Sequence, residues 1–373
     1  MRKILPFLLV LTACAPFGKE PPAFERMAVT EIEGFGESPL LPAVRTFVKS
    51  CDWLTEKNPV LGGEEDWQPV CQEAEFIATE GDARVFFTSR FDAVKLHGGH
   101  ALVTGYYEPV FEASAARTEA FDQPVLARPE DLVAVDLGAF RDDLKGRRIA
   151  GRIEDGRLVP YADREAIELS PPAEAEILGY MRADDLFFLQ IQGSGVLEFP
   201  EGARRIGYAA QNGHPYKAIG KTLVEEGHMA LEDVTMQSIR QWLATAPEED
   251  AARVRASNPS YVFFTDRGPA EGDEGPLGTA GVPLTADYSV AVDRFAIPLG
   301  APVFISGEDD VLSISKLTVA QDTGGAIRGP DRVDLFLGRG DEAGETAGRL
   351  KLDADIVVLI PKGAALPIAE PGA

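Results

Sequence analysis

Short apolar runs, each separated from the next by glycine, proline or aspartate, fill the chain from Tyr261 to its end. Runs of this length between turn-forming residues predict β-strands rather than helices. A series of such strands is typical of a small β-barrel. The runs lie at residues 290–293, 303–305, 317–320, 333–337 and 356–360.

Four more strands are predicted in the first and middle parts of the chain. Residues 145–153 and 155–159 predict two short strands around an Asp155-Gly156 turn. The apolar residues at 85–87 and 101–104 predict the other two.

The segment 186–193, with the sequence LFFLQIQG, also predicts a strand. Side chains alternate between the two faces of a strand, so this prediction places Gln190 and Gln192 on one face. Leu189 and Ile191 are then expected on the other face.

Helical spacing of apolar residues is confined to two parts of the chain. Between residues 42 and 78 it is mixed with a polar, glycine-containing loop. The second part covers 214–226, 231–245 and 247–256, with Pro247 at a first-turn position that a helix tolerates. The sequence therefore predicts a mainly β fold with some helices.

The N-terminus has the pattern of a secretory signal. A basic start precedes the apolar run 4–11, which is far shorter than the roughly 20 residues that a spanning helix needs. The quartet Leu11-Thr12-Ala13-Cys14 resembles a bacterial lipobox, in which the cysteine is acylated and becomes the first residue of the mature chain. We therefore expect residues 1–13 to be a signal peptide and Cys14 to carry the lipid.

The residues after Cys14 predict how the protein is attached. Residues 14–30 contain proline and show no periodicity, so we expect a linker. Ala15 follows the cysteine, as in lipoproteins sorted to the outer membrane, which places the protein on the periplasmic face of that membrane. Two or more acyl chains make such a lipid anchor stable. The alternative is an ordinary signal peptide with a chance cysteine.

The two other cysteines are Cys51 and Cys71. In an oxidising compartment such a pair favours a disulfide, which would stabilise the fold by about 3 kcal/mol. The cysteines and histidines show no spacing typical of a zinc site, so neither a metal nor a cofactor is expected. The histidines are His97, His100, His214 and His228.

The net charge of −24 excludes one large class of functions. Nucleic-acid binding requires lysine and arginine concentrated on one face, and this chain is strongly acidic. The charge also disfavours binding to anionic lipid headgroups, and it favours a neutral or locally cationic substrate. Most of the acidic side chains are expected to serve solubility only.

Three aspartates near the C-terminus, Asp293, Asp322 and Asp334, lie where strands are expected to begin or end. The glycine-rich segment 323–330 lets the chain turn sharply, which would bring Asp322 and Asp334 close together. A carboxyl beside apolar neighbours and a second carboxylate has a raised pKa, as a general acid needs near neutral pH. The alternative is that Asp334 points outward and is solvated.

The surroundings of these aspartates resemble the three-aspartate motif of the membrane-bound lytic transglycosylase A family. The motif segments are VDR at 292–294, QDTGGAIRG at 321–329 and VDLF at 333–336. Upstream segments extend the resemblance over residues 40–361. They are VTGYYEP at 103–109, FFLQIQGSG at 187–195, GYAAQNGHPY at 207–216, NPSYVFF at 258–264 and VPLT at 282–285.

The resemblance implies a double-psi β-barrel with a second, β-rich domain inserted into it. The barrel would comprise residues 31–104 and 261–365, and the inserted, substrate-binding domain residues 105–260, with the glycan in a groove between them. The family's catalytic aspartate falls on Asp334. The segment before it carries an extra residue compared with some relatives, which leaves Asp331 as a competitor, but Asp334 fits the strand pattern better.

The implied reaction cleaves peptidoglycan between N-acetylmuramic acid and N-acetylglucosamine and forms a 1,6-anhydromuramyl product. Asp334 would act as acid and then as base, while Asp322 supports it electrostatically and Asp293 holds loops through backbone N–H groups.

The glycan strands are the expected partner of a monomeric protein, and other cell-wall enzymes are candidate protein partners. Candidate sugar-binding residues are Tyr106, Tyr107, Glu108, Gln190, Gln192 and Ser194; of the two tyrosines, at most one can line the groove.

Two other functions compete with this one. The triplet Asp322-Thr323-Gly324 resembles the active-site triplet of aspartic proteases, but Gly325 follows it and the chain has no second copy. The other alternative is a noncatalytic glycan-binding lipoprotein, because a barrel with a groove can bind without chemistry.

Overall fold

The computed structural model describes residues 24–57, 61–96, 99–144, 147–270, 272 and 274–366. The expected signal peptide 1–13 and Cys14 lie outside the described residues, as does His97. Contacts divide the chain into two compact units. The first unit comprises Met1–Val103, Val290–Asp334 and Leu352–Ala373, and the second comprises Thr104–Ser289 and Leu335–Lys351.

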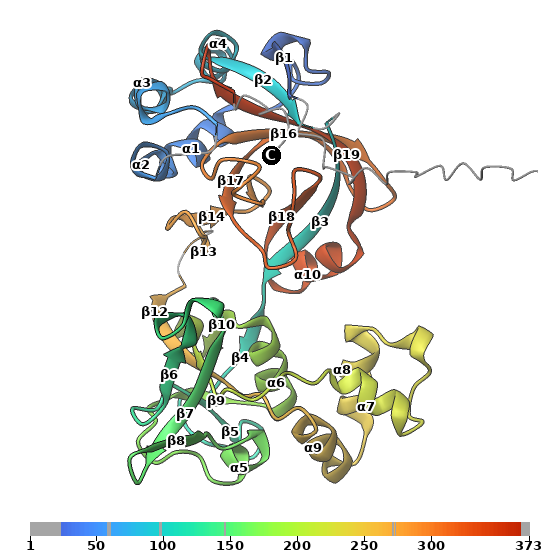
Figure 1. The fold of residues 1–373 in the computed structure, drawn as a ribbon. Helices are drawn as coiled ribbons and strands as arrows, with labels where there is room; N and C mark the ends of the chain where they lie inside the picture. Colours follow the sequence, from blue (N-terminus) through green and yellow to red (C-terminus); the bar gives the residue numbers. More distant parts are fainter. Residues whose placement is uncertain are drawn as a thin grey trace, which may run out of the picture. The chain divides into compact units, whose positions relative to one another are not determined.

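The largest sheet has eight strands and contains a closed barrel (Figure 1). Six of its strands form a ring, in the order β19-β16-β17-β15-β18-β3, because β3 also pairs with β19; β1 and β2 extend the sheet beyond β19. The barrel confirms the predicted mainly β fold. The strands are β1 (Phe24–Ala28), β2 (Phe91–Leu96), β3 (His100–Glu108), β15 (Ser289–Ala291), β16 (Pro302–Glu308), β17 (Ser313–Asp322), β18 (Arg332–Arg339) and β19 (Lys351–Pro361).

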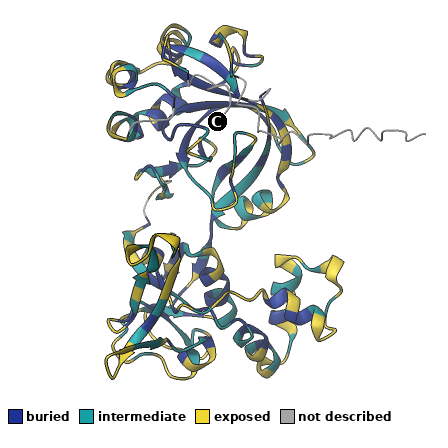
Figure 2. Ribbon diagram, in the orientation of Figure 1, coloured by how far each residue is buried: buried dark blue, intermediate teal, exposed yellow. Residues whose placement is uncertain are grey.

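The C-terminal strands form because their apolar residues can be buried on both faces of the barrel sheet. Every residue from Ile356 to Pro361 is buried, as are Pro302 to Ile305. Figure 2 accordingly shows much of these strands in dark blue. All five short runs predicted after Tyr261 coincide with strands, each longer than or shifted slightly from its prediction.

Among the described residues, four α-helices precede β2 in the first unit: α1 (Leu41–Lys49), α2 (Cys51–Glu56), α3 (Glu64–Ala74) and α4 (Glu80–Arg90). The helical spacing predicted between residues 42 and 78 is therefore confirmed. The strand predicted at 85–87 is wrong, because these residues lie in α4. Thr79 caps this helix by accepting a hydrogen bond from the Asp82 N–H, and Phe86 and Phe87 are buried on one side of it.

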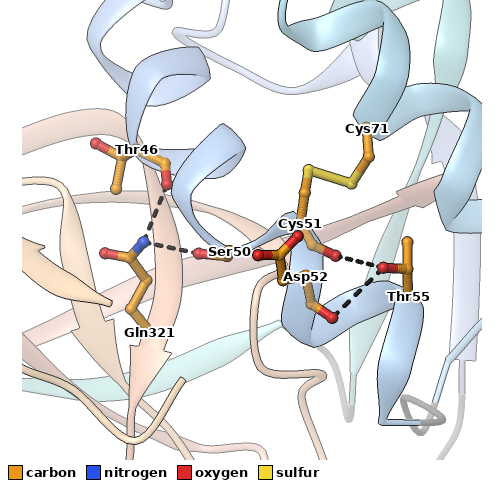
Figure 3. Close-up of a disulfide and its surroundings, with 7 residues drawn as sticks. All are labelled: Thr46, Ser50, Cys51, Asp52, Thr55, Cys71 and Gln321. Atoms are coloured by element: carbon orange, nitrogen blue, oxygen red, sulfur yellow. Dashed lines mark hydrogen bonds between the residues drawn. A yellow bond between two sulfur atoms is a disulfide. The ribbon is translucent and has the colours of Figure 1, made fainter. Parts of the chain in front are cut away.

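A disulfide joins Cys51 of α2 to Cys71 of α3, with 5.6 Å between their Cα atoms (Figure 3). The helices around it enclose a cluster of aromatic rings that includes Phe47 and Trp67. This part of the first unit is thus fixed by both a covalent link and apolar packing.

The expected linker 14–30 extends too far. Residues 24–28 form β1, which pairs antiparallel with β2 from Phe24 opposite Leu96 to Ala28 opposite Asp92. The segment shows little alternation of its own, because all five residues of β1 are exposed or half-buried and the strand is held by backbone pairing at the sheet edge.

The second unit contains several small sheets. A four-stranded sheet has the order β12-β11-β10-β4, and three smaller ones are β6-β7-β8, β5-β9 and β13-β14. Their bounds are β4 (Val110–Glu112), β5 (Gln123–Leu126), β6 (Val133–Asp136), β7 (Arg148–Glu154), β8 (Arg157–Pro160), β9 (Ile177–Met181), β10 (Ser194–Phe199), β11 (Gly202–Gln211), β12 (Val262–Pro269), β13 (Glu274–Leu277) and β14 (Pro283–Thr285).

The predicted hairpin around Asp155-Gly156 is confirmed by β7 and β8. Both turn residues have positive φ, 50° and 74°, as a two-residue hairpin turn requires. The predicted helical patch is also present, with shorter helices than expected. The helices of this unit are α5 (Arg164–Leu169), α6 (Ala183–Gln192), α7 (Ile219–Glu225), α8 (Met236–Thr245), α9 (Glu248–Ala256) and α10 (Gly340–Arg349).

The strand predicted at 186–193 is wrong, because these residues belong to α6. Two aspartates in its first turn favour the helix N-terminus, and Gly193 ends the helix with φ 80°, a conformation that glycine adopts without strain. The consecutive residues Leu186 to Gln190 are buried in the core of the second unit. A helix buried on so many sides has no clear amphipathic period, which is why its sequence resembles a strand.

Candidate functional site

The three motif aspartates come from three neighbouring strands. In the barrel, β15 lies between β17 and β18. Asp322 is the last residue of β17, Asp334 is near the start of β18, and Asp293 follows the end of β15. The N–H of Val292 donates to the carbonyl oxygen of Asp322 at 3.0 Å, which joins the ends of β15 and β17.

Asp334 occupies a half-buried position on an alternating strand. Its neighbours Val333 and Leu335 are 0% and 1% exposed and point into the core, so the side chain of Asp334 lies on the opposite face of β18. A half-buried carboxyl is accessible to a substrate and is still partly shielded from water. Asp331, the competitor named above, is exposed in the connection before β18.

Asp293 fixes two backbone segments. Its Oδ1 accepts the Phe295 N–H at 3.0 Å, and its Oδ2 accepts the Gly329 N–H at 2.9 Å. Although burial raises the pKa of this carboxyl, the hydrogen bonds from Gly329 and Phe295 and the nearby Arg328 and Arg294 hold the pKa below its ordinary value of 3.8. The ionised Asp293 thereby holds the glycine-rich connection between Asp322 and Asp334 against the end of β15.

Gln321 belongs to the motif segment 321–329, and the sequence predicts no separate role for it. Its side chain is fully buried, and its Nε2 donates to the Thr46 carbonyl oxygen at 3.0 Å and to the Ser50 Oγ at 2.7 Å (Figure 3). Ser50 directly precedes the disulfide residue Cys51. The residue before Asp322 is therefore anchored to the disulfide-linked helices, and no local signal in the sequence indicates this, because Thr46 and Ser50 are remote in the chain.

The side chain of Glu108 is not accessible to a sugar in this structure, in contrast to its predicted role in sugar binding. Its side chain is 0% exposed, and Arg205 donates to its two oxygens at 2.6 and 3.2 Å. Arg339 adds a hydrogen bond at 3.1 Å. Both arginines also donate to the Glu274 carbonyl oxygen. The carboxylate thus joins β3, β11 and β18 as an internal ion pair.

The two tyrosines before Glu108 are half-buried on β3. The ring of Tyr106 packs against Phe336, with 5.3 Å between centroids. The ring of Tyr107 lies so close to Gly344 of α10 that a Cβ there would be 2.8 Å from it. Each ring therefore has one packed side, and part of each remains accessible.

The other candidate sugar-binding residues occupy different surroundings, because α6 is a helix. Gln190 is 5% exposed, its Nε2 donates to the Val262 carbonyl oxygen at 3.2 Å, and its Oε1 has no hydrogen-bond partner. Gln192 is exposed at the C-terminal end of α6, so the two glutamines do not share a face. Ser194 is half-buried at the start of β10.

The histidines in the described part of the chain have separate roles. His100 pairs with Asp355, His228 with Glu226, and the Nε2 of His214 lies 2.8 Å from the Tyr161 carbonyl oxygen. Among the described residues, no group of histidines, cysteines and acidic side chains could hold a metal ion. No described helix is long and apolar enough to cross a membrane.

A hollow of about 530 Å³ opens beside the motif aspartates in the first unit. It is formed by the segment after β15 and by the start of the glycine-rich connection after β17. Its lining residues are Val292, Asp293, Arg294, Phe295, Thr323, Gly324, Gly325 and Arg328.

Comparison with known protein families identifies two matching segments. Residues 102–265 match the family described as MltA specific insert domain, and residues 288–360 match the 3D domain. Membrane-bound lytic murein transglycosylase A of Escherichia coli (strain K12) is 33% identical over 318 residues, which cover 81% of this chain and 78% of that protein. The protein of the same name from Vibrio cholerae is 29% identical over 301 residues, 76% of this chain and 73% of that protein.

Solved structures show the same likeness. MltA from Neisseria gonorrhoeae has a TM-score of 0.82 and 32% identity, over 95% of this chain and 94% of that chain. Escherichia coli MltA with bound chitohexaose has a TM-score of 0.62 and 26% identity, over 90% of this chain and 93% of that chain.

Proposed function

Because the chain belongs to the membrane-bound lytic murein transglycosylase A family, we propose that it is a peptidoglycan lytic transglycosylase. It cleaves the β-1,4 bond between N-acetylmuramic acid and N-acetylglucosamine and leaves a 1,6-anhydromuramyl end. The observation that carries this proposal is 33% identity over most of the chain to a protein of that name. The matches to both the insert domain and the 3D domain support it.

Asp334 is the catalytic residue in this proposal, acting as acid and then as base. Its carboxyl group donates a proton to the glycosidic oxygen as the bond from that oxygen to the muramyl C1 breaks. The resulting carboxylate takes the proton of the muramyl C6 hydroxyl as its oxygen bonds to C1. No water is consumed, so one carboxyl group suffices where a hydrolase ordinarily needs two.

The other two aspartates have supporting roles. The negative charge of Asp322 would stabilise the positive charge that develops at the sugar ring and favour the protonated form of Asp334. Asp293 would keep the connection between them in place, which its hydrogen bonds to the Phe295 and Gly329 N–H groups support.

The sugar contacts are proposed from the accessible members of the predicted set. One of the two tyrosines, Tyr106 or Tyr107, can offer the unpacked part of its ring to the apolar face of a sugar, because consecutive residues of β3 face opposite sides. Gln192 and Ser194 can offer polar groups to the sugar hydroxyls. Glycan strands of peptidoglycan are the proposed partner. The E. coli structure with bound chitohexaose supports a glycan as ligand.

Attachment to the membrane is proposed to depend on Cys14. The relatives are named membrane-bound, and no described helix of this chain could span a bilayer. A lipidated Cys14 would hold the protein on the periplasmic face of the outer membrane.

The activity is tested by incubating the purified full-length protein, in detergent, with purified sacculi and analysing the soluble products by mass spectrometry. We expect muropeptides that are lighter by one water than the products of hydrolysis, because the C6 hydroxyl replaces water as the nucleophile. Ordinary reducing ends would instead identify a hydrolase. Release of no soluble muropeptide would support the noncatalytic glycan-binding alternative.

A further inference from the structure

The hollow beside the motif aspartates is locally cationic in a strongly acidic protein. Among its lining residues, Arg294 and Arg328 carry positive charge and only Asp293 carries negative charge. The whole chain has 60 acidic and 36 basic side chains, so two arginines around one small hollow run against its average composition.

The two guanidinium groups are available to a ligand. Both side chains are exposed. Arg328 donates to the Ile327 carbonyl oxygen at 3.2 Å, and the guanidinium of Arg294 lies 5.1 Å from the centre of the Phe295 ring. No carboxylate among the described residues forms an ion pair with either arginine. Each therefore keeps unused N–H donors that match the geometry of a carboxylate.

The single carboxylate in the lining of the hollow, that of Asp293, already accepts hydrogen bonds from the protein. Both oxygens of Asp293 accept backbone N–H groups, so the charge of Asp293 is partly compensated within the protein. An anion entering the hollow meets two cationic side chains and one ionised carboxylate, whose two oxygens already accept backbone hydrogen bonds. The local balance favours an anionic ligand.

The hollow also has an apolar residue in its lining and free space beside its glycine-rich segment. Phe295 is 76% exposed and offers the face of an aromatic ring at the edge of the hollow. A Cβ built on Gly325 would meet no atom within 4 Å, so the glycine-rich segment leaves free space. A ligand with both a carboxylate and short apolar groups fits these surroundings.

From these features we infer that the hollow binds a carboxylate of the peptide attached to N-acetylmuramic acid. The inference rests on the proposed function, because the muramyl residue at the cleaved bond carries this peptide through its lactyl group. The lining includes Asp293 and Thr323, the residue after Asp322, so the hollow lies beside two of the three motif aspartates. Arg294 and Arg328 bind the carboxylate, and Phe295 contacts the apolar part of the peptide.

Binding is tested by isothermal titration calorimetry with a muramyl peptide that retains its free carboxylates. The test variant is Arg294→Gln with Arg328→Gln, and the control variant is Arg117→Gln with Arg157→Gln, which removes the same charge from exposed positions of the second unit. We expect Kd to rise about tenfold in the test variant, because charge-assisted hydrogen bonds are lost, and to stay unchanged in the control. A muramyl peptide with amidated carboxylates should bind the native protein about tenfold more weakly.

Two further measurements keep the result interpretable. Thermal unfolding checks that the test variant is folded, and a variant with lysine at both positions should recover part of the affinity, because it restores the charge without the bidentate geometry. Equal affinity of the native protein and the folded glutamine variant, or of the free and amidated peptides, would overturn the inference. This titration involves no turnover, so its failure is distinct from a failure to form anhydromuropeptides from sacculi.

Discussion

At the scale of single residues, Glu108 shows how a carboxylate can belong to the framework of a catalytic protein. It is buried, and its charge is compensated by Arg205 and Arg339, which are themselves largely covered. Removing one partner of such a group leaves buried charge without compensation, which is far more costly than losing an exposed ion pair.

We therefore predict that Glu108→Gln lowers the free energy of unfolding by about 3 kcal/mol. Urea unfolding followed by circular dichroism measures it. The matched control is Glu112→Gln, because Glu112 forms an exposed ion pair with Arg182 and should change stability by less than about 1 kcal/mol. Similar losses in the two variants would refute the distinction between them.

The lowered pKa of Asp293 predicts that the stability of the fold depends on pH. Its pKa in the folded protein is held below 3.8, so its ionised form stabilises the fold at neutral pH, and this contribution is lost as the pH falls through the ordinary pKa toward the folded one. The native protein should exceed Asp293→Asn in unfolding free energy at neutral pH, and the difference should shrink below about pH 4. Urea unfolding across that range measures the difference, and a constant gap would show that ionisation of Asp293 is not involved.

The sequence identifies residues whose surroundings are local and misses those whose partners are distant. Asp334 could be selected because its strand and its motif are contiguous in the chain. Glu108 could not be assigned correctly, because its arginine partners are 97 and 231 positions away. The anchoring of Gln321 to Thr46, 275 positions away, was hidden for the same reason.

At the scale of elements, short apolar runs between turn-forming residues predicted the C-terminal strands correctly, but two such runs, at 85–87 and 186–193, lie in helices. The C-terminal strands and the β7–β8 hairpin were predicted from short runs and turn residues. The residues of α6 are buried on nearly every side, so their sequence contains neither a helical nor an alternating period. The pattern predicts Gly193 as the end of a strand, whereas in the structure it is the left-handed residue that ends helix α6.

The role of Gly193 gives a prediction with an internal control. Gly193→Ala should lower the melting temperature, because a non-glycine residue at φ 80° costs about 1 kcal/mol, although a Cβ would meet no atom within 4 Å. Gly81→Ala, within helix α4, should instead raise it slightly, because alanine favours the helix and its Cβ would have space. Differential scanning calorimetry measures both, and a shift of the same sign in both variants would contradict this explanation.

At the scale of the whole molecule, the barrel is assembled from segments that are remote in the chain. β3 lies beside β18 and also pairs with β19, and these strands are separated by most of the second unit. Periodicity predicts the individual strands but contains no information on which strands pair. The pattern alone predicted a small barrel, and the family resemblance, carried by several motifs in order, added the expectation of an inserted domain.

Lipid attachment is also a property of the whole molecule. In cells expressing the full chain, Cys14→Ser should move the protein from the membrane fraction to the soluble periplasmic fraction, because no acyl chain can then be added. Fractionation followed by immunoblotting measures the distribution, with Ala15→Ser as a control that keeps the cysteine. Retention of Cys14→Ser in the membrane fraction would show that another feature attaches the protein.

The central claim is that one carboxyl group, that of Asp334, performs the chemistry. The decisive measurement is the rate of 1,6-anhydromuropeptide release from sacculi by Asp334→Asn, compared with Asp331→Asn as the exposed neighbour and with thermal unfolding as the check on folding. We predict a loss of about a hundredfold or more for Asp334→Asn, because the amide cannot donate and then accept the proton, and nearly full activity for Asp331→Asn. A folded Asp334→Asn that releases anhydromuropeptides at the native rate would contradict the account.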